Sequence, residues 1–297
     1  MNESPIIILC GTTASGKSAL ALEISKRINS VIVNCDSMQI YKNIQILTAQ
    51  PTENDLLLNK HELYNYVNPE ENYSVARWIQ DVLPIIKDYR GKGITPIIVG
   101  GTGFFINTLI YGLSTIPVIP KEFLLEIDKE IKKIGVEKIY NQLKLIDPTI
   151  KFSINDYKRI LRSYSVLKYT DKPFSYWNDK KDIYFPITDF KVMYLDVSRE
   201  QTYYNCNVRF DQMLKRGVID EIESLMHIDE NNTIVQAHGF KTIRNYIKGD
   251  ITYNDMSEEV KKITRNYVKR QISWFKNKLK NYHKIQNIND FNNIFKD

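Results

Sequence analysis

Short, largely apolar runs recur along the chain, and segments without helix breakers follow them. These runs cover residues 6–10, 31–33, 96–99 and 191–196. Apolar residues at consecutive positions indicate a strand that is buried on both faces, as in a parallel sheet covered by helices. The pattern therefore predicts an α/β protein whose parallel sheet core has helices on both faces.

The segment between the third and fourth runs differs, because its apolar residues recur with the period of a helix. Its helices are expected at 121–134, 136–145 and 155–169. Further helices are expected at 17–28, 200–215, 218–227, 240–248 and 257–281. The chain is thus predicted to contain a core formed by 1–115 and 186–297, with an inserted, mainly helical subdomain at 116–185.

Composition favours a folded protein in a reducing compartment. Of the 297 residues, 43% are hydrophobic and 26% are charged, which excludes a disordered chain. The cysteines Cys10, Cys35 and Cys206 form no CxxC pair, so neither a disulfide framework nor a zinc ribbon is expected. The first apolar stretch is too short for a signal peptide, and no run reaches the roughly 20 apolar residues of a membrane helix. We expect a cytoplasmic protein that does not enter a membrane.

The net charge of +6 is unevenly distributed. The first 120 residues carry 9 Lys and Arg against 10 Asp and Glu, whereas the remainder carries 32 against 25. All of the excess positive charge therefore lies in the second part of the chain. This asymmetry suggests a polyanionic partner, although an ordinary solvated basic face gives the same counts.

Residues 11–18 read GTTASGKS and match the phosphate-loop pattern GxxxxGK[ST] between a predicted strand and a predicted helix. In such a loop, backbone N–H groups and the helix N-terminus form a concave anion site. Lys17 adds a positive charge, and Ser18 can hold Mg²⁺. We predict that a ligand with a diphosphate group binds to Gly11, Thr12, Thr13, Ala14, Ser15, Gly16, Lys17 and Ser18.

The ends of the second and third strands adjoin this loop, since ligands of open α/β sheets bind at the carboxyl ends of the strands. The second strand leads into Asp36, and the third ends in a glycine-rich turn at 100–103. No acidic residue ends the third strand, where a hydrolytic ATPase would have one, so a motor ATPase is disfavoured. Asp36 is well placed as a general base, the alternative being a surface residue that caps a strand.

Further motifs complete an ordered set along the whole chain. They read DSMQIY at 36–41, YSVARW at 73–78, PIIVGGTGFF at 96–105, DP at 147–148, KRILRSYSV at 158–166, RFDQMLKRG at 209–217, HGFKTIRNYIKGDI at 238–251 and KRQISWFK at 269–276. In this order and spacing, with the phosphate loop, they resemble the bacterial tRNA dimethylallyltransferases, or tRNA isopentenyl transferases. No single segment would be specific.

The resemblance implies transfer of a dimethylallyl group from dimethylallyl diphosphate to N6 of the adenosine immediately 3′ of the anticodon, position 37 of tRNA. The phosphate loop would then bind the leaving diphosphate, and no hydrolytic machinery would be needed. Asp36 would accept a proton from the adenine amino group, and Thr102 would help to fix the adenine. Lys17, Ser18 with Mg²⁺, and Arg209 would stabilise charge on the diphosphate.

The resemblance also implies which residues contact tRNA. A stacked base cannot reach such a site, so the target adenosine must be extruded from the anticodon stem-loop. The contacts expected from the family pattern are Asp36, Ser37, Met38, Gln39, Thr102, Lys158, Arg159, Ile160, Leu161 and Arg162. No obligatory protein partner is inferred.

The last long helix offers a second basic surface. Residues 261–284 contain nine Lys and Arg and no Asp or Glu. One face of the predicted helix carries Lys261, Arg265, Lys269, Lys276 and Lys280, and we expect this stripe, Lys269 and Lys276 included, to follow phosphates. A second stripe contains Val260, Ile263, Tyr267 and Trp274, and it is expected to be core instead of a surface for stacking bases.

Some positions depart from the family pattern. The loop begins Gly11-Thr12-Thr13 where Gly-Pro-Thr is usual, Gln50 and Gln236 replace a lysine and an arginine, and Lys158 replaces a glutamine. These changes are expected in RNA-facing or supporting positions. Two other functions stay open: a P-loop nucleotide or small-molecule kinase, which should have an arginine-rich lid and use ATP, and a noncatalytic RNA-binding module, which the intact loop and Asp36 disfavour.

Overall fold

The computed structural model describes residues 4–295, which form two compact units. The first unit comprises the chain up to Ile110 and again from Phe185, and the second comprises Tyr111–Tyr184. The second unit starts a few residues before the predicted boundary at 115/116. The reason is a short antiparallel pair, β5 (Leu113–Ser114) with β6 (Lys181–Asp182), which joins the two ends of the insertion.

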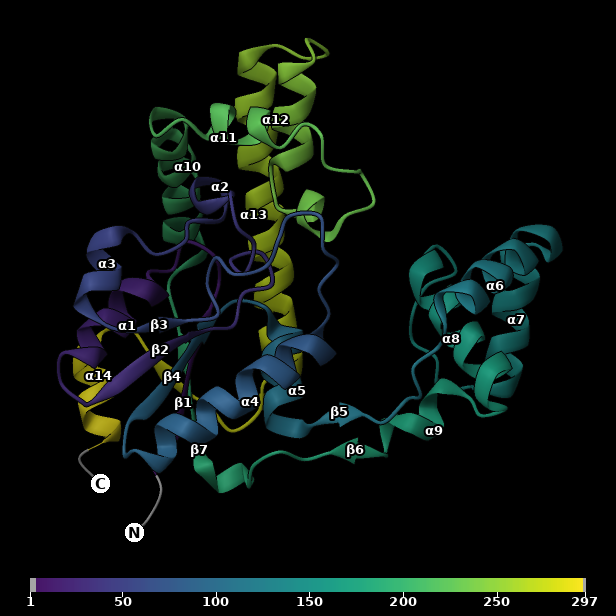
Figure 1. The fold of residues 1–297 in the computed structure, drawn as a ribbon, viewed down its shortest axis with the longest axis horizontal. Helices are drawn as coiled ribbons and strands as arrows, with labels where there is room; N and C mark the ends of the chain where they lie inside the picture. Colours follow the sequence, from purple (N-terminus) through teal and green to yellow (C-terminus); the bar gives the residue numbers. More distant parts are fainter. Residues whose placement is uncertain (1–3, 296–297) are drawn as a thin grey trace. The chain divides into compact units, whose positions relative to one another are not determined.

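The first unit is built on a parallel sheet with the strand order β3-β2-β4-β1-β7-β8 (Figure 1). The four predicted strands correspond to β1 (Ile6–Gly11), β2 (Ser30–Asn34), β4 (Thr95–Gly100) and β7 (Phe190–Leu195). The edge strands β3 (His61–Glu62) and β8 (His283–Ile285) were not expected, because two or three residues make no readable apolar run. The predicted parallel α/β core is confirmed.

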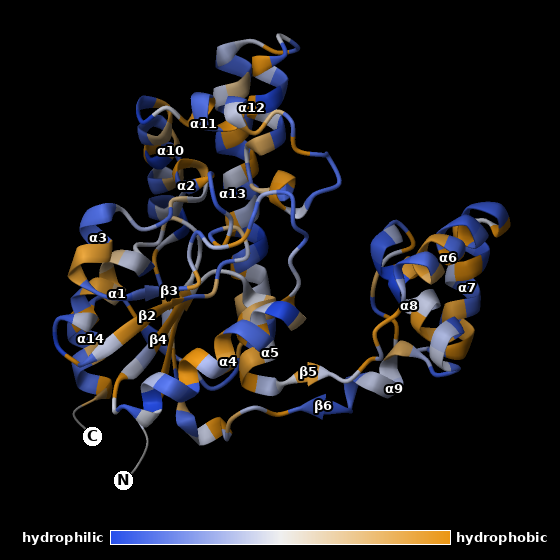
Figure 2. Ribbon diagram, in the orientation of Figure 1, coloured by the Kyte–Doolittle hydropathy of each residue, from blue (hydrophilic) through white to orange (hydrophobic). Residues whose placement is uncertain are grey.

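Both faces of this sheet are buried, as the continuous apolar runs require (Figure 2). On one face Ile7, Leu9 and Ile97 pack against α1 (Lys17–Ser25) and α14 (Ile288–Ile294) in a single cluster. The alternate strand residues face the other side, where α4 (Val75–Gly91) and α13 (Tyr253–Lys278) contact β4 and β1. At about 25 cal/mol per Å² of buried apolar surface, this double-sided core is the main source of stability of the unit.

The first unit has further helices besides those that cover the sheet. They are α2 (Gln45–Thr48), α3 (Glu53–Leu58), α5 (Gly103–Tyr111), α10 (Arg199–Lys215), α11 (Val218–Ser224) and α12 (Phe240–Ile247), with one-turn helices at Ile187–Asp189 and Thr233–Gln236. The longest helix, α13, starts four residues earlier than predicted, because the Thr252 side chain accepts a hydrogen bond from the Asp255 N–H and caps it. It packs along α10 and α12.

The second unit has a core of its own. Its helices are α6 (Lys121–Ile134), α7 (Val136–Ile146), α8 (Tyr157–Thr170) and α9 (Phe174–Asn178). Ile131, Ile139 and Ile160 are fully buried in one apolar cluster with Tyr164. The predicted mainly helical insertion is therefore present as a self-contained bundle. Among residues 4–295, no helix is long and apolar enough to cross a membrane.

We predict that Gly100→Ala is strongly destabilising, because a Cβ at Gly100 would lie 2.0 Å from the carbonyl oxygen of Cys35. The backbone of one strand end must move, at a cost at or above the upper end of the usual 1–3 kcal/mol for overpacking. The control Gly91→Ala places a methyl group in open space at the end of α4. It should be neutral or stabilise by up to about 1 kcal/mol. Urea unfolding of both variants measures the contrast, and equal midpoints would contradict it.

Candidate active site

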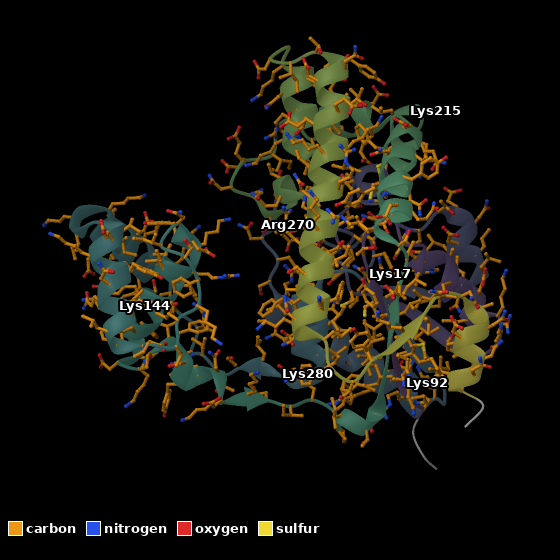
Figure 3. The ribbon with its side chains drawn as sticks, turned by 180° about the vertical axis from the view of Figure 1, so that it is seen from behind. Lys17, Lys92, Lys144, Lys215, Arg270 and Lys280 are labelled. Carbon is orange, nitrogen blue, oxygen red and sulfur yellow. The ribbon has the colours of Figure 1, made fainter. Side chains whose placement is uncertain are left out.

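The phosphate loop connects β1 to α1, and its own hydrogen bonds hold it in shape. Ser15 Oγ donates to the Thr12 carbonyl at 2.8 Å, and Lys17 Nζ donates to the same oxygen at 2.5 Å. Ala14 lies in the left-handed region with φ of 58°. Figure 3 shows Lys17 inside the first unit and Arg270 on α13. The predicted strand–loop–helix context of GTTASGKS is present.

Lys17 and Arg209 are the cationic side chains that line this loop's cavity, and within residues 4–295 no carboxylate lies at salt-bridge distance from either. Burial lowers the pKa of Lys17 to about 8; the Asp36 carboxylate opposes this shift and Arg209 adds to it. Burial also lowers the pKa of Arg209, which extends from α10 and donates from Nη2 to Thr13 Oγ1 at 2.7 Å. Buried positive charge without a matching anion is costly, so the geometry favours an anionic ligand at the loop.

Asp36 and Thr102 are brought together by two neighbouring strand ends. The Thr102 N–H donates to the Cys35 carbonyl at 3.3 Å, and Thr102 Oγ1 accepts from the Ser37 N–H at 3.0 Å. Asp36 Oδ1 accepts from the Met38 N–H at 2.9 Å, which orients the carboxylate. The structure thus assembles the predicted pair Asp36 and Thr102 beside the predicted phosphate loop.

Two cavities meet at Asp36. The larger one, about 470 Å³, is lined by the phosphate loop with Gln39 and Asn205. The smaller one, about 220 Å³, has an apolar wall formed by Leu47, Phe210, Met213 and Val260. Thr13, Asp36, Thr48 and Arg209 line both cavities. An anion in the first cavity and an apolar group in the second could therefore belong to one ligand that passes the Asp36 carboxylate.

Three site residues on or beside α13 were not predicted from the sequence as site residues. His238 and Tyr267 line the smaller cavity with ring centroids 4.0 Å apart. Gln271, 5% exposed, lies behind the loop, where its Oε1 accepts from the Thr13 N–H. Burial, with Arg270 and Arg209 adding to it, lowers the pKa of His238 to about 4, so this imidazole is neutral near pH 7. A polar side chain on the apolar face of a predicted helix is the signal that could have identified Gln271.

The predicted core stripe on α13 is only partly correct. Val260 is 1% exposed, but Ile263, Tyr267 and Trp274 are half-buried. The buried positions of the helix, listed by sequence, are Met256, Ser257, Val260, Thr264, Val268, Gln271 and Phe275. Tyr267 therefore lines the site instead of the core. Trp274 lines a shallow groove with Lys269, Arg270 and Ser273.

The predicted basic stripe on α13 is likewise only partly available. Lys261 forms a 2.8 Å ion pair with Asp211 and is 15% exposed, and Arg265 Nη1 donates to Asn207 Oδ1 at 2.7 Å. Both side chains fasten α13 to α10, and a contact with phosphate would have to compete with these interactions. Lys280 lies beyond the end of the helix. Lys269 and Lys276 are exposed and free to meet a ligand.

In the second unit, the segment 158–162 lies on α8, beside a cavity of about 530 Å³ lined by Arg159, Arg162 and Phe152. Ile160 is fully buried in the bundle core, so the expected RNA contact by its side chain is wrong. Leu161 also packs against this core. Lys158, Arg159 and Arg162 are exposed, although Arg159 makes a 3.3 Å ion pair with Asp156.

The departures from the family pattern lie in different surroundings. Gln50 is 6% exposed, and its Nε2 donates to the Tyr41 carbonyl at 2.8 Å, so it supports the chain after β2 and cannot face RNA. Gln236 is exposed and lines the smaller cavity. Gln39 Nε2 donates to the carbonyls of Thr48 and Ala49, both at 2.9 Å, which ties it to the cavity wall.

Fold and site together define an α/β protein with two joined cavities at the carboxyl edge of a parallel sheet. Family models described as IPP transferase and isopentenyl transferase match residues 39–278 and 4–65. The chain is 38% identical over 288 residues to a tRNA dimethylallyltransferase of Acetivibrio thermocellus, covering 95% of this chain and 90% of the relative. It is 39% identical to one of Ehrlichia canis, covering 93% of each. The chain belongs to the IPP transferase family.

Solved structures agree with this assignment. The full-length tRNA isopentenylpyrophosphate transferase of Bacillus halodurans has a TM-score of 0.68 at 29% identity and covers 96% of this chain and 90% of its own. A eukaryotic dimethylallyltransferase acting on tRNA has a TM-score of 0.79 at 28% identity, covering 92% and 70%. The resemblance read from the motifs is confirmed.

We predict that His238 makes stability fall with acidification. Its folded-state pKa of about 4 is below that of an unfolded histidine, so between about pH 6.5 and 4 only the unfolded chain takes up the proton. Stability is therefore lost as pH falls through this window. His238→Gln removes that loss. As pH falls through this window, the free energy of unfolding of the variant should therefore rise relative to that of wild type, by at most about 1.4 kcal/mol per pH unit.

The measurement is urea unfolding of both proteins between pH 7 and pH 5. His283→Gln, which removes an exposed imidazole from β8, serves as the control. A difference between His238→Gln and wild type that stays constant with pH would contradict the prediction.

Proposed function

We propose that this member of the family transfers the dimethylallyl group of dimethylallyl diphosphate to N6 of adenosine 37 in tRNA, immediately 3′ of the anticodon. The observation that carries the proposal is the junction, at the Asp36 carboxylate, of a cavity lined by the phosphate loop with Lys17 and a cavity with an apolar wall. A prenyl diphosphate has these two parts. The action of related enzymes on tRNA supports the acceptor, and a soluble tRNA acceptor suggests action in the cytoplasm.

The donor's diphosphate is proposed to bind along Gly11, Thr12, Thr13, Ala14, Ser15, Gly16, Lys17 and Ser18. Lys17 and Arg209 lie at this cavity as cations, so they can stabilise the charge that grows on the leaving diphosphate. Their contacts strengthen as the carbon–oxygen bond lengthens. The short branched prenyl chain would lie along Phe210, Met213 and Val260 in the smaller cavity.

The proposed transfer takes place beside the Asp36 carboxylate. The N6 nitrogen of adenine forms a bond to the first prenyl carbon as the bond from that carbon to the diphosphate oxygen breaks. The proton lost from N6 passes to the Asp36 carboxylate, and diphosphate leaves with the electron pair of the broken bond. Thr102 and the Ser37 backbone, which already hold each other, are positioned to orient the adenine beside Asp36.

Mg²⁺ is the proposed cofactor. Among the described residues, no group of three or more His, Cys, Asp or Glu could hold a metal ion, which fits an ion that takes most of its ligands from diphosphate and water. Ser18, in the first turn of α1, lines the phosphate cavity and can supply one oxygen. The ion would neutralise charge on the diphosphate when bound.

The tRNA anticodon stem-loop is the proposed partner. Its adenosine must leave the stack, at a cost of a few kcal/mol, to reach Asp36 inside the site. Ser37, Met38 and Gln39 line the cavities that it would enter. The phosphates of the loop would meet Lys269 and Lys276 on α13, and Lys158, Arg159 and Arg162 of the second unit provide further contacts. A kinase is not favoured, because the apolar-walled cavity beside Asp36 suits a prenyl group instead of a polar phosphate acceptor.

We expect wild-type protein, incubated with dimethylallyl diphosphate, Mg²⁺ and unmodified tRNA, to produce N6-dimethylallyladenosine. Asp36→Asn keeps the size of the side chain but removes the base, so the rate should fall roughly 10²–10⁴-fold while diphosphate still binds. Nuclease digestion and mass spectrometry measure the product. If wild type forms none but consumes ATP with a small acceptor, the kinase function holds instead. A fully active Asp36→Asn enzyme would remove Asp36 from the mechanism.

The double substitution Lys269→Ala and Lys276→Ala should weaken tRNA binding mainly through its salt dependence. Each contacted phosphate contributes a log–log slope of roughly −0.7 to −0.9, so the slope should flatten by about one to two units. Donor affinity should not change, because neither lysine lines the phosphate cavity. The control removes two exposed charges elsewhere, Lys26→Ala with Arg27→Ala. A salt series of binding measurements that gives the wild-type slope would assign both lysines to a solvated face.

A further inference from the structure

Gln271 connects two parts of the site that carry different components of the reaction. Its side chain is 5% exposed on the inner face of α13. Oε1 accepts from the Thr13 N–H in the phosphate loop at 2.8 Å, and Nε2 donates to the Gly101 carbonyl after β4 at 3.0 Å. One amide therefore spans the gap between the loop and the glycine-rich turn.

Each end of this bridge continues into a group placed in the mechanism. The Thr13 hydroxyl also accepts a hydrogen bond from Arg209, which is proposed to bind the diphosphate. Thr13 is therefore held by both Gln271 and Arg209. Gly101 precedes Thr102, whose hydroxyl accepts from the N–H of Ser37, next to Asp36. The path from donor site to acceptor site thus runs through Gln271 with a hydrogen bond on each side.

The chemistry of the bridge requires an amide. The Thr13 N–H needs an acceptor, and the Gly101 carbonyl needs a donor, and both lie within reach of one planar group. Asn and Gln alone among the side chains present a carbonyl oxygen and an NH₂ group on the same carbon. A buried carboxylate would face the Gly101 carbonyl with like partial charge, and an apolar side chain would leave two buried backbone groups unpaired.

We infer that Gln271 is a positioning residue of the transfer reaction, which fixes the distance between the diphosphate on the phosphate loop and the adenine beside Thr102. The inference rests on the proposed function. Gln271 lines the phosphate cavity, and we assign its effect to the two backbone groups that it holds, the Thr13 N–H and the Gly101 carbonyl. Because reacting atoms must approach to about 3–3.5 Å, a displacement of 1 Å costs on the order of 10²-fold in rate. The loop keeps its other hydrogen bonds, so ground-state binding of diphosphate should change much less.

The test compares Gln271→Met, which is similar in length but forms neither bond, with wild type in single-turnover transfer. The rate at saturating donor and tRNA should fall roughly 10–100-fold. The affinity for inorganic diphosphate, measured by calorimetry, should change by less than about threefold if the loop retains its shape. Val268→Ala, a buried truncation on the same helix, provides the control for loss of stability alone.

Gln271→Glu supplies a readout that a purely structural role would not give. Its protonated carboxyl group can form both bonds, but its carboxylate cannot donate to Gly101. The ratio of its rate to the wild-type rate should therefore rise as pH falls, by up to about tenfold per pH unit, whereas the ratio for Gln271→Met stays flat. Lys17, Asp36 and Arg209 line the same cavity as Gln271, and Tyr267 precedes it by about one turn of α13. The pH profiles of wild type and Gln271→Met are therefore recorded beside that of Gln271→Glu, to separate the titration of these groups from that of the new carboxyl group.

The outcomes distinguish failure of the proposed function from failure of the inference about Gln271. If wild type forms no prenylated adenosine, the proposed function fails. The inference about Gln271 is overturned if wild type is active and Gln271→Met transfers the prenyl group at the wild-type rate. It is also overturned if Val268→Ala, with the same Tm as Gln271→Met, loses as much transfer rate as Gln271→Met does. A rate loss confined to the Gln271 variants, with diphosphate affinity kept and a rising pH ratio for Gln271→Glu, establishes it.

Discussion

The active site depends on how closely two strand ends approach at the carboxyl edge of the sheet. The Cys35 carbonyl occupies the space that a side chain on Gly100 would need. Asp36, which follows Cys35, and Thr102, two residues after Gly100, are brought together as a result. The core behind them is rigid, because β2 and β4 are paired in register and buried on both faces. A close-packed interior transmits such a constraint with little give. The phosphate loop follows the adjacent β1, so its cavity is lined by Asp36 and by the end of β4 as well.

The fold was predictable where its causes are local. Apolar runs of three to six residues identified β1, β2, β4 and β7, since burial on both faces leaves a mark in the sequence itself. The edge strands β3 and β8 have no such apolar run in the sequence, because their pairing is imposed by neighbours from distant parts of the chain. Helix ends also shifted by a few residues wherever a capping side chain decided them, as Thr252 does for α13.

The candidate site, like the fold, was predictable from the sequence only where its residues are close together in the chain. The phosphate loop and Asp36 could be proposed from the sequence because the pattern that suggests each lies within a few residues. Gln271 contacts Thr13 across 258 positions of sequence, and no spacing rule reports such a pair. The charge pattern on α13 does not report long-range ion pairs either. Lys261 belongs to a regular basic stripe in the sequence, but it forms an ion pair with Asp211 on another helix. Ile160, inside a basic segment, serves the core of its own bundle.

The antiparallel pair β5–β6 has a consequence for how this chain can diversify. At that pair the backbone is so close that a side chain on Gly112 would collide with the Asp182 carbonyl, so the insertion begins and ends at one tightly closed neck. The entropy of closing the insertion grows only slowly with its length, and the neck keeps its ends together whatever lies between them. With its own apolar cluster, the bundle can lengthen, shorten or be exchanged while the sheet keeps its registers. The insertion can therefore change in sequence and length without altering the strand ends that hold Asp36 and Thr102 together.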